Sequence, residues 1–486
     1  MFKASMDKPQ GNVLSINCPR VVLCGLRGGS GKTVLTLGLI GALRKRGLTV
    51  SPFKKGPDYI DPQWLSLAAG RPCRNLDAFL MEREQILASV SGHSRDADIV
   101  FIEGNRGLYD GMDDAGTFST AELAVMLDSP VLLIVDCTKT TRTAAAMVLG
   151  CKMMNADLKL GGVILNQVAC DRQETVIRAA VEKETGLPVV GALRRLKDFS
   201  FDERHLGLYP PPDHAKPLPL LERMADEIEN HVDVESVFRL AATSSSLPVF
   251  LSPDKRFSNG EIVRVGVIRD AAFHFYYPEN LEALERNGAR MVEISAVSDP
   301  HLADVDALYI GGGFPEAHAA QLADNDSFRE ELAAEIEKGL PVLAECGGLI
   351  YLGKSLSVEG KPYPMTGVFP VSYTVSPRPQ GHGYTILETD RDNPFFPRGM
   401  ELRGHEFRYA AVTENHHDMR QTAFHVHRGF GFDGVRDGLL YKNVMASFCH
   451  HHTGGTEIWA ENMVRLAVQY KRIRQTWMNR SCGTFG

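Results

Sequence analysis

The sequence lacks the features that mark secreted, membrane-spanning and general nucleic-acid-binding proteins. No CxxC pair occurs among its nine cysteines, which favours free thiols in a reducing compartment over a disulfide framework. The longest apolar runs, such as VLLIV at 131–135, are no longer than a strand, so we expect neither a signal peptide nor a membrane span. A formal net charge of −7 argues against general nucleic-acid binding, although a local basic patch could hold an acidic ligand. We therefore predict a cytoplasmic globular protein.

The sequence does contain two series of short apolar runs that are typical of buried parallel strands. In the first series the runs do not alternate with polar residues, and helical segments separate them, which predicts a doubly wound parallel sheet. A stretch rich in Pro, Ser and charge follows, and then a second α/β series begins. A length of 486 residues suits two such domains. The predicted parts are an N-terminal tail (1–17), a first α/β domain (18–206), a peripheral helix and linker (207–261) and a second α/β domain (262–486).

The segment RGGSGKT (27–33) lies between the first predicted strand and a helix that begins near Lys32. Glycines allow backbone N–H groups to approach phosphate oxygens, a lysine adds positive charge, and a threonine hydroxyl suits Mg²⁺. Leu26 stands where the usual pattern has its first glycine, and the loop instead resembles the deviant phosphate loop of ParA, MinD and dethiobiotin synthetase. The alternative, a plain glycine-rich turn, is disfavoured by the flanking strand and helix. The predicted ATP-binding residues of this P-loop are Gly28, Gly29, Ser30, Gly31, Lys32 and Thr33.

Two acidic stretches follow later strands of the first half and are candidates for a Mg²⁺ site. FKKGPDYIDP (53–62) carries Asp58 and Asp61, and FIEGNRGLYDG (101–111) places Glu103 at the end of a strand, where α/β sheets present ligand groups. A cation that bridges phosphates needs one or two carboxylates. A single Asp in a loop is more often a turn or cap residue, but two carboxylates beside a phosphate loop favour binding. The predicted Mg²⁺ ligands are Thr33, Asp58 and Glu103.

In the second half, GLPVLAECGGLIYLG (339–353) runs from a predicted buried strand through Cys346 into a helix. A sharp strand-to-helix turn of this kind exposes a thiol, and the helix N-terminus favours the thiolate. Upstream, YIGGGFPE (309–316) is a glycine-rich turn suited to offering backbone N–H groups to an oxyanion. A lone cysteine is usually a core residue, but the two turns together favour a nucleophile. The predicted oxyanion and substrate-binding glycines are Gly312, Gly313 and Gly347.

A catalytic cysteine needs a base, and NVMASFCHHHTGG (443–455) offers three adjacent histidines later in the chain. One of them fits a base that the fold brings beside the thiol. The alternative is a metal site, to which His405, His425 and His427 could contribute. Successive side chains of a strand point to opposite faces, so three adjacent histidines cannot all reach one ion.

These motifs, in this order, resemble the a,c-diamide synthases of cobyrinate and related tetrapyrroles, which join a dethiobiotin-synthetase-like domain to a class I glutaminase domain. The resemblance covers most of the chain and rests on KKGPDYIDP, EGNRGLYDG, RHLGL (204–208), AECGGLIYL and RGHEF with the histidine cluster. It implies that Cys346 attacks the side-chain amide of glutamine and frees ammonia. His450 is then the base, and His452 matches the second histidine of the family pattern. The resemblance also implies that no third acidic residue completes the catalytic group.

The resemblance further implies that the first domain transfers the γ-phosphate of ATP, bound with Mg²⁺, to an acetate carboxylate of the macrocycle. Ammonia then displaces the phosphate, and both the a and the c acetates of cobyrinate are amidated, as in cobalamin biosynthesis. The implied partners are ATP, glutamine and a polycarboxylate tetrapyrrole, with no nucleic acid or membrane, and a homodimer is the family-based expectation. Many carboxylates require cations. The implied substrate-binding residues are Lys54, Lys55, Tyr59, Asp61, Arg71, Arg74 and Arg106.

Departures from the family pattern leave alternatives open. Asn105 and Arg106 replace an apolar pair, and Arg408 stands where a histidine is frequent. The substrate alternatives are therefore sirohydrochlorin, Ni-sirohydrochlorin and hydrogenobyrinate. Outside this class of enzyme, the alternatives are a ParA- or MinD-like ATPase switch with a regulatory glutaminase-like domain, and a module that carries a metal or a tetrapyrrole.

Overall fold

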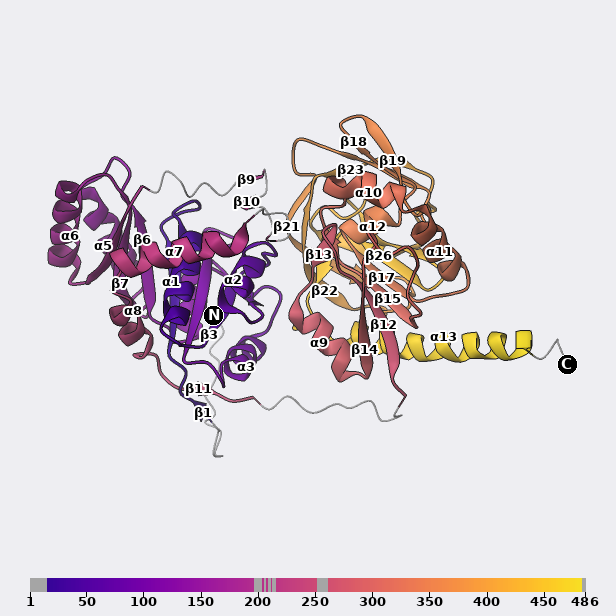
Figure 1. Cartoon of the computed structure of the whole chain (residues 1–486), viewed down its shortest axis with the longest axis horizontal. Helices are drawn as coiled ribbons and strands as arrows, with labels where there is room; N and C mark the ends of the chain where they lie inside the picture. Colours follow the sequence, from indigo (N-terminus) through magenta and orange to yellow (C-terminus); the bar gives the residue numbers. More distant parts are fainter. Residues whose placement is uncertain are drawn as a thin grey trace. The chain divides into compact units, whose positions relative to one another are not determined.

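The computed structural model describes residues 15–195, 203–204, 207–208, 211, 216–250 and 261–482. The chain forms two compact units, one of Met1–Ala78 with Glu82–Pro253 and one of Phe79–Met81 with Asp254–Gly486. Each unit contains a large sheet with parallel strands, so the predicted α/β class is confirmed (Figure 1). His205 and Leu206 of RHLGL lie outside the described residues, as do 1–14 of the predicted tail and 251–260 of the predicted linker.

The sheet of the first unit has seven strands in the order β4-β3-β5-β2-β6-β7-β8, and every neighbouring pair is parallel. Its central strand β2 is buried at every position, as expected where helices cover both faces of a sheet. Because all strands run the same way, the carboxyl ends of β2, β3 and β5 lie at one edge. The bounds are β2 (Arg20–Gly25), β3 (Val50–Lys55), β4 (Arg74–Leu76), β5 (Ile99–Gly107), β6 (Val131–Asp136), β7 (Leu160–Val168) and β8 (Val189–Arg194).

Helices connect these strands, and two more follow the last strand. The stretch 207–261, for which one peripheral helix and a linker were expected, contains two helices, α7 and α8, and both are part of the first unit. Short strand pairs also occur, β1 (Ser15–Ile16) with β11 (Leu247–Pro248) and β9 (Glu203–Arg204) with β10 (Gly207–Leu208). The helices are α1 (Lys32–Lys45), α2 (Asp61–Ala69), α3 (Arg83–His93), α4 (Thr120–Met126), α5 (Thr143–Met154), α6 (Asp171–Thr185), α7 (Pro217–His231) and α8 (Val234–Ala241).

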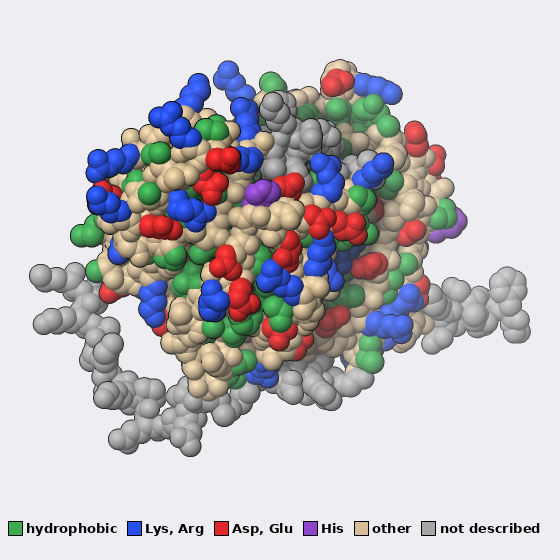
Figure 2. Space-filling view, turned by 60° about the vertical axis from the view of Figure 1, so that its left-hand side comes forward, with side chains coloured by type: hydrophobic (Ala, Val, Ile, Leu, Met, Phe, Trp, Pro, Cys, Tyr) green, Lys and Arg blue, Asp and Glu red, His purple; other side chains and the backbone are tan. Residues whose placement is uncertain are grey.

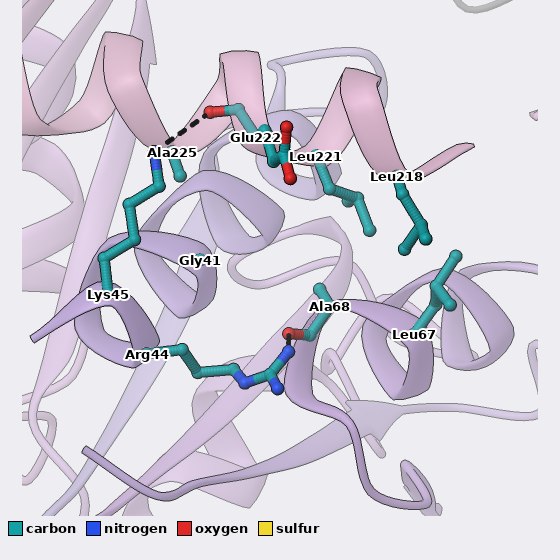
Figure 3. Close-up of a pocket in the computed structure, with 9 residues that line it drawn as sticks. All are labelled: Gly41, Arg44, Lys45, Leu67, Ala68, Leu218, Leu221, Glu222 and Ala225. Atoms are coloured by element: carbon teal, nitrogen blue, oxygen red, sulfur yellow. Dashed lines mark hydrogen bonds between the residues drawn. The ribbon is translucent and has the colours of Figure 1, made fainter. Parts of the chain in front are cut away.

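Helix α7 packs closely along α1 because α1 carries glycine at the contact. A Cβ added at Gly38 would lie 2.5 Å from Ile228 Cγ1 and 2.8 Å from the carbonyl oxygen of Met224. A pocket opens farther along, between α1, α2 and α7, where Arg44 donates to the carbonyl of Ala68 at 2.7 Å (Figure 3). This pocket lies toward the C-terminal end of α1, whereas the predicted phosphate loop precedes its N-terminus, so it is distinct from the predicted ATP site.

The sheet of the second unit has ten strands and is half parallel and half antiparallel. Strands β14-β12-β15-β17-β26 are parallel, and β25-β24-β21-β22-β27 continue the same sheet in antiparallel order. The sequence predicted the parallel half, whereas the antiparallel half was not identified. The bounds are β12 (Val263–Ile268), β14 (Ala289–Ile294), β15 (Ala307–Ile310), β17 (Val342–Glu345), β21 (Gly381–Thr389), β22 (Glu401–Arg408), β24 (Thr422–Arg428), β25 (Arg436–Tyr441), β26 (Val444–Ser447) and β27 (His450–His451).

Two hydrophobic clusters cover the two faces of this sheet. Val342 and Ala344 of β17 belong to one cluster, and Leu343 between them belongs to the other. Smaller sheets join β13 (Phe273–Phe275) to β16 (Gly312–Gly313), and link β18 (Ser355–Val358), β19 (Lys361–Pro364), β20 (Val371–Val375) and β23 (Ala410–Asn415). The helices of this unit are α9 (Pro278–Arg286), α10 (Ala319–Asp324), α11 (Asp326–Glu337), α12 (Gly347–Tyr351) and α13 (Ile458–Cys482).

The surface shows no segregation of charge on the face that Figure 2 presents, where Lys and Arg side chains are interspersed with Asp and Glu side chains. In the described part of the chain, every helix is too short or too polar to span a lipid bilayer.

Replacement of glycine by alanine should have opposite effects on stability at two helical glycines, because only one of them packs against α7. We expect Gly38→Ala to destabilise the first unit by about 1–2 kcal/mol, because the new methyl group meets the backbone of α7. In contrast, Gly150→Ala on α5 meets nothing within 4 Å and should stabilise the same unit by up to about 1 kcal/mol. Urea unfolding followed by circular dichroism measures both, and a gain in stability for Gly38→Ala would contradict the close helix contact.

Candidate functional site

The predicted phosphate loop joins the end of β2 to the start of α1. Gly29 and Gly31 adopt positive φ angles of 71° and 88°, which favour glycine. A Cβ at Gly31 would lie 2.3 Å from Nδ2 of Asn166, the atom that donates to the carbonyl of Ser30. The Lys32 side chain folds back over the loop, and its ammonium donates to the backbone oxygens of Arg27 (3.2 Å) and Arg106 (2.8 Å). The loop therefore has the backbone conformation and the lysine placement of an anion site.

Three charged side chains form a cluster in which Lys54 lies on β3, Asp61 at the start of α2, and Glu103 within β5, four residues before that strand ends and not at its end as the sequence suggested. Nζ of Lys54 lies 2.5 Å from Asp61 Oδ2 and 2.6 Å from Glu103 Oε1, and the Lys54 side chain is only 2% exposed. Thr33 at the start of α1 donates to the same Glu103 oxygen at 3.0 Å. Burial alone lowers the pKa of Lys54, but the two carboxylates outweigh it and hold that pKa well above its ordinary value. Lys54 is thus a charged bridge between carboxylates.

This cluster fits a divalent cation by its donor set. Burial is the main cause that raises the pKa of Glu103, and its Oε2 has no hydrogen-bond partner among the residues that the structure describes. The Thr33 hydroxyl lies beside the same carboxylate, and oxygen donors of this kind suit Mg²⁺. Burial and repulsion from Asp61 raise the pKa of Asp58 to about 7, so a nearby cation would favour its ionised form.

The loop after β3 positions Asp58 through backbone hydrogen bonds. Oδ1 of Asp58 accepts the N–H groups of Ile60 (2.9 Å) and Asp61 (3.1 Å). Asn75 on the neighbouring strand β4 holds the loop from the other side, because its Nδ2 donates to the carbonyls of Gly56 and Asp58 at 2.7 Å each. Asp58 therefore has the turn role that is common for a loop Asp, in addition to lying next to the charged cluster.

The structure brings only some of the predicted substrate-binding residues together. Lys55 ends β3 and is buried, and burial lowers its pKa; the Arg106 side chain is exposed at the end of β5. Tyr59 is half-buried in the loop with Asp58. Arg74 is buried at the start of β4. Arg71 instead pairs with Asp96 at 2.7 Å, shortly before β5 begins, and so lies at the opposite edge of the sheet from the phosphate loop.

The second unit contains the predicted nucleophile elbow. Cys346 follows the last residue of β17 and precedes α12, and its φ of 49° places it in the left-handed region that non-glycine residues seldom adopt. Its backbone N–H donates to the carbonyl of Ser447 at 2.8 Å, and its Sγ lies 3.6 Å from the carbonyl oxygen of Phe407. The sheet thus holds the turn from both sides, and the strained turn presents the thiol.

Glycines of the predicted oxyanion turn lie directly against this elbow. A Cβ at Gly347 would lie 3.1 Å from the backbone nitrogen of Gly313. A Cβ at Gly312 would lie 2.4 Å from Cε1 of His450. Three segments that are distant in the sequence, namely the oxyanion turn, the elbow and the histidine cluster, therefore meet at one point with no room for a side chain between them.

His450 on β27 is the histidine that reaches Cys346. Its ring is buried, and burial by itself lowers its pKa. The interactions of the ring with Cys346 and with the Glu345 carboxylate outweigh the burial and raise the pKa of His450 to about 10. The imidazolium form is thereby stabilised beside the thiol, which is the arrangement that a thiolate nucleophile requires.

The other members of the cluster have different surroundings. His451 packs against the rings of Phe396 and Phe424, and burial lowers its pKa to about 4. His452 Nε2 lies 3.7 Å from Glu279 Oε2. Across the parts of the chain that the structure describes, no three His, Cys, Asp or Glu side chains are grouped as ligands of a metal ion.

Two residues near the elbow differ from what the sequence suggested. The carboxylate of Glu345 lies next to the His450 ring, with Oε2 3.7 Å from Nδ1, although no acidic neighbour was expected. A glutamate just before the nucleophile was visible in AECGGL, but strand alternation predicts that it points away from the cysteine. Arg408 donates to the carbonyls of Ala410 and Gly431 at 2.7 Å each, which gives it a structural role inside the second unit.

Comparison with protein families matches both units. Residues 21–208 match the CobQ/CobB/MinD/ParA nucleotide binding domain, and residues 264–458 match the CobB/CobQ-like glutamine amidotransferase domain. Together the two matches cover more than half of the chain, in the order that the motifs predicted.

Several known sequences resemble the chain over nearly its whole length. It is 43% identical to the cobyrinate a,c-diamide synthase of Magnetococcus marinus, over 92% of this chain and 97% of that protein. It is 39% identical to the proteins of the same name from Archaeoglobus fulgidus, over 94% of this chain and 100% of the relative, and Methanothermobacter thermautotrophicus, over 93% and 100%.

The Lys54 cluster predicts a large loss of stability when its cation is removed. We expect Lys54→Met to destabilise the first unit by about 3–5 kcal/mol at pH 7, because two carboxylates then remain buried without a counter-charge. The loss should shrink at pH 5, since protonation of these carboxylates removes the repulsion. Lys45→Met breaks the exposed pair with Asp226 and should cost about 1 kcal/mol or less. Urea unfolding at both pH values tests this, and equal losses for the two variants would contradict it.

Proposed function

Because this chain belongs to the cobyrinate a,c-diamide synthase family, we propose that its two units couple glutamine hydrolysis to the ATP-dependent amidation of two acetate carboxylates of a tetrapyrrole. The enzyme class is a glutamine-dependent carbon–nitrogen ligase, and the reaction, the amidation of cobyrinate, belongs to cobalamin biosynthesis. The observation that carries the assignment of residues is the meeting of Cys346, His450 and the Gly312–Gly313 turn at one point. The residue roles that follow are part of the proposal.

In the second unit, His450 takes the proton of the Cys346 thiol. The thiolate then attacks the amide carbon of the glutamine side chain, forming a C–S bond, while backbone N–H groups of the Gly312–Gly313 turn and Gly347 face the developing oxyanion. The imidazolium returns its proton to the nitrogen, the C–N bond breaks, and ammonia leaves. Water hydrolyses the thioester to glutamate, and the free thiol is restored.

In the first unit, an acetate oxygen of the macrocycle attacks the γ-phosphorus of ATP, the bond from that phosphorus to the β–γ bridging oxygen breaks, and ADP leaves. The phosphate loop residues 28–33 hold the phosphates through backbone N–H groups and the Lys32 ammonium. Thr33 and Glu103, with Asp58 nearby, would hold Mg²⁺, which supplies positive charge to the phosphates. Phosphate is a better leaving group than the oxygen of a carboxylate, so ammonia displaces it from the acyl phosphate and an amide forms. A second cycle amidates the second acetate.

Only some of the predicted substrate-binding residues of this unit lie where they could contact the macrocycle. A macrocycle with many carboxylates needs cations to bind it. Arg106 and Lys55 lie at the carboxyl edge of the sheet, with Tyr59 beside them, and are therefore the favoured substrate contacts. Lys54 and Asp61 form an ion pair with each other, and their proposed role is to stabilise the charged cluster. Arg71 and Arg74 receive no role in the proposal. Cytoplasmic location and a homodimer stay predictions.

Because the two units are proposed to carry out different reactions, one substitution in the second unit should abolish glutamine-dependent amidation and leave ammonia-driven amidation unchanged. We expect Cys346→Ser to lower glutamine-dependent amidation by at least about 10³-fold, because serine is a far weaker nucleophile at this position. Amidation driven by ammonium chloride should be unchanged, since it needs only the first unit. Cys170→Ser replaces an exposed thiol and should retain both activities. Product formation by liquid chromatography measures each rate. Loss of the ammonia-driven reaction in Cys346→Ser would contradict two separate sites. A wild-type chain without glutaminase activity, whose function Cys346→Ser leaves unchanged, would favour an ATPase switch with a regulatory second unit.

The family also predicts the substrate. With ATP, Mg²⁺ and glutamine, we expect cobyrinate to gain two amide groups, each of which lowers the product mass by the difference between OH and NH₂. Mass spectrometry of reactions with cobyrinate, hydrogenobyrinate, sirohydrochlorin and Ni-sirohydrochlorin tests this. Diamide formation only from sirohydrochlorin or its nickel form would overturn the cobyrinate assignment while leaving the reaction class intact.

A further inference from the structure

The pair of Cys346 and His450 needs a group that orients the imidazole. A histidine that accepts a proton on one ring nitrogen works best when a hydrogen-bond acceptor holds the other nitrogen and stabilises the positive charge. Glu345 is the acidic residue in that position, with Oε2 3.7 Å from Nδ1 of His450 and both side chains at most 2% exposed. This distance is slightly longer than a hydrogen bond, as is common for catalytic contacts in the absence of substrate.

Glu345 is itself held in place from two sides. Its Oε1 accepts the backbone N–H of His451 at 3.0 Å. Its Oε2 accepts the Tyr309 hydroxyl at 3.0 Å, from the neighbouring strand β15. The carboxylate therefore has little freedom to rotate away from the ring of His450, and its burial means that no bulk water competes for it.

A third layer fixes these partners. Nδ2 of Asn280 on α9 donates to the Tyr309 hydroxyl oxygen at 3.2 Å and to the carbonyl of His451 at 2.8 Å. Oδ1 of the same side chain accepts the N–H of Thr453 at 2.9 Å. Burial and the Glu345 carboxylate keep the pKa of Tyr309 well above its ordinary value, so its hydroxyl remains a donor. A continuous hydrogen-bonded chain thus leads from α9 to the catalytic histidine.

We propose that Glu345 is a positioning residue for the glutaminase reaction, holding Nδ1 of His450 so that Nε2 faces the Cys346 thiol. The proton of Cys346 moves to Nε2, the His450 imidazolium is balanced by the Glu345 carboxylate, and the carboxylate stays ionised throughout. The same proton leaves Nε2 for the departing ammonia. Glu345 thus takes the place of the acidic residue that the sequence indicated to be missing, and it does so from the position directly before the nucleophile.

The titratable groups around His450 and Glu345 support the expected direction of the effect, namely that Glu345 raises the pKa of His450. The titratable groups that act on His450 are Cys346 and Glu345, and both raise its pKa against the effect of burial. The nearby His451 is kept neutral, since burial lowers its pKa to about 4. Tyr309 and Tyr276 remain protonated because burial raises their pKa values. Glu345 is therefore the anion that favours the imidazolium once the thiol proton has been transferred.

A second glutamate–histidine pair in the same unit offers a matched control. Glu279 Oε2 lies 3.7 Å from His452 Nε2, the same separation as in the Glu345–His450 pair, and both side chains are largely buried. The electrostatic contact is therefore similar, but His450, and not His452, is the ring that hydrogen-bonds to Cys346. Charge removal at Glu279 tests whether any buried carboxylate in this region has the effect assigned to Glu345.

The proposal is tested with Glu345→Gln in the full chain, which keeps the size of the side chain and removes its charge. We expect kcat for glutamine hydrolysis to fall about 10²-fold or more, with KM for glutamine unchanged because Glu345 does not touch the substrate. The alkaline limb of the pH profile of kcat/KM should move to lower pH, since an imidazolium without its counter-charge loses its proton more easily. Tyr309→Phe should move the limb in the same direction by a smaller amount.

Alkylation of Cys346 by iodoacetamide, followed by mass spectrometry of its peptide, provides a readout without turnover. Glu345→Gln should slow this alkylation at pH 7, whereas Glu279→Gln should leave both it and the pH profile unchanged. Unchanged kcat and alkylation in Glu345→Gln, or an equal effect of Glu279→Gln, would overturn the proposal. The inference rests on the proposed glutaminase function, but the two fail differently. A wild-type protein that does not hydrolyse glutamine would contradict that function, while the alkylation rates would still test Glu345. Ammonia-driven amidation should persist in every variant and reports that the first unit is intact, while urea unfolding of each full-length variant reports that the second unit is folded.

Discussion

Both candidate sites depend on one constraint, namely that all strands of a parallel sheet end at the same edge. At that edge the chain must turn sharply from strand to helix, and the turn requires backbone conformations that neither element uses. The first unit meets this requirement with glycines, including Gly31 at a φ of 88°. The second unit meets it with Cys346 itself at a φ of 49°. In each case the turn places side chains of proposed function at the carboxyl edge of the sheet.

The cost of burying charge shapes what surrounds these turns. An isolated ion in a protein interior is strongly unfavourable, so buried charges occur in compensated groups. In the first unit, Lys54 lies between Asp61 and Glu103. In the second, the proposed role of Glu345 is to compensate the imidazolium of His450. The same physical rule therefore explains the largely structural Lys54 in the first unit and the proposed role of Glu345 in the second.

Much of the fold could be predicted because its signals are local. The helix after the phosphate loop begins at Lys32, as expected, and the strand-length apolar run at 131–135 lies within β6. The antiparallel half of the second sheet was missed, because strands such as β21 are only partly buried and carry a weaker apolar pattern. Arg71 was assigned to the substrate-binding cations through the family resemblance, whereas the turn after α2 carries it to the opposite edge of the sheet.

The sequence by itself determined the class of fold, the phosphate loop, the nucleophile elbow and the family, because each of these is written in consecutive residues whose chemistry acts over a few ångströms of chain. The family resemblance already named His450 as the partner of Cys346, whereas only the tertiary structure decided that Glu345 lies next to the His450 ring. Those contacts depend on strand pairing between distant segments, with Glu345 opposite Ser447 across β17 and β26, and His405 opposite His450 across β22 and β27. A shift of one residue in either register would exchange the faces of the strand. Thus CHHH, which resembles a metal site when it is read alone, places only His450 beside Cys346 when the sheet is assembled.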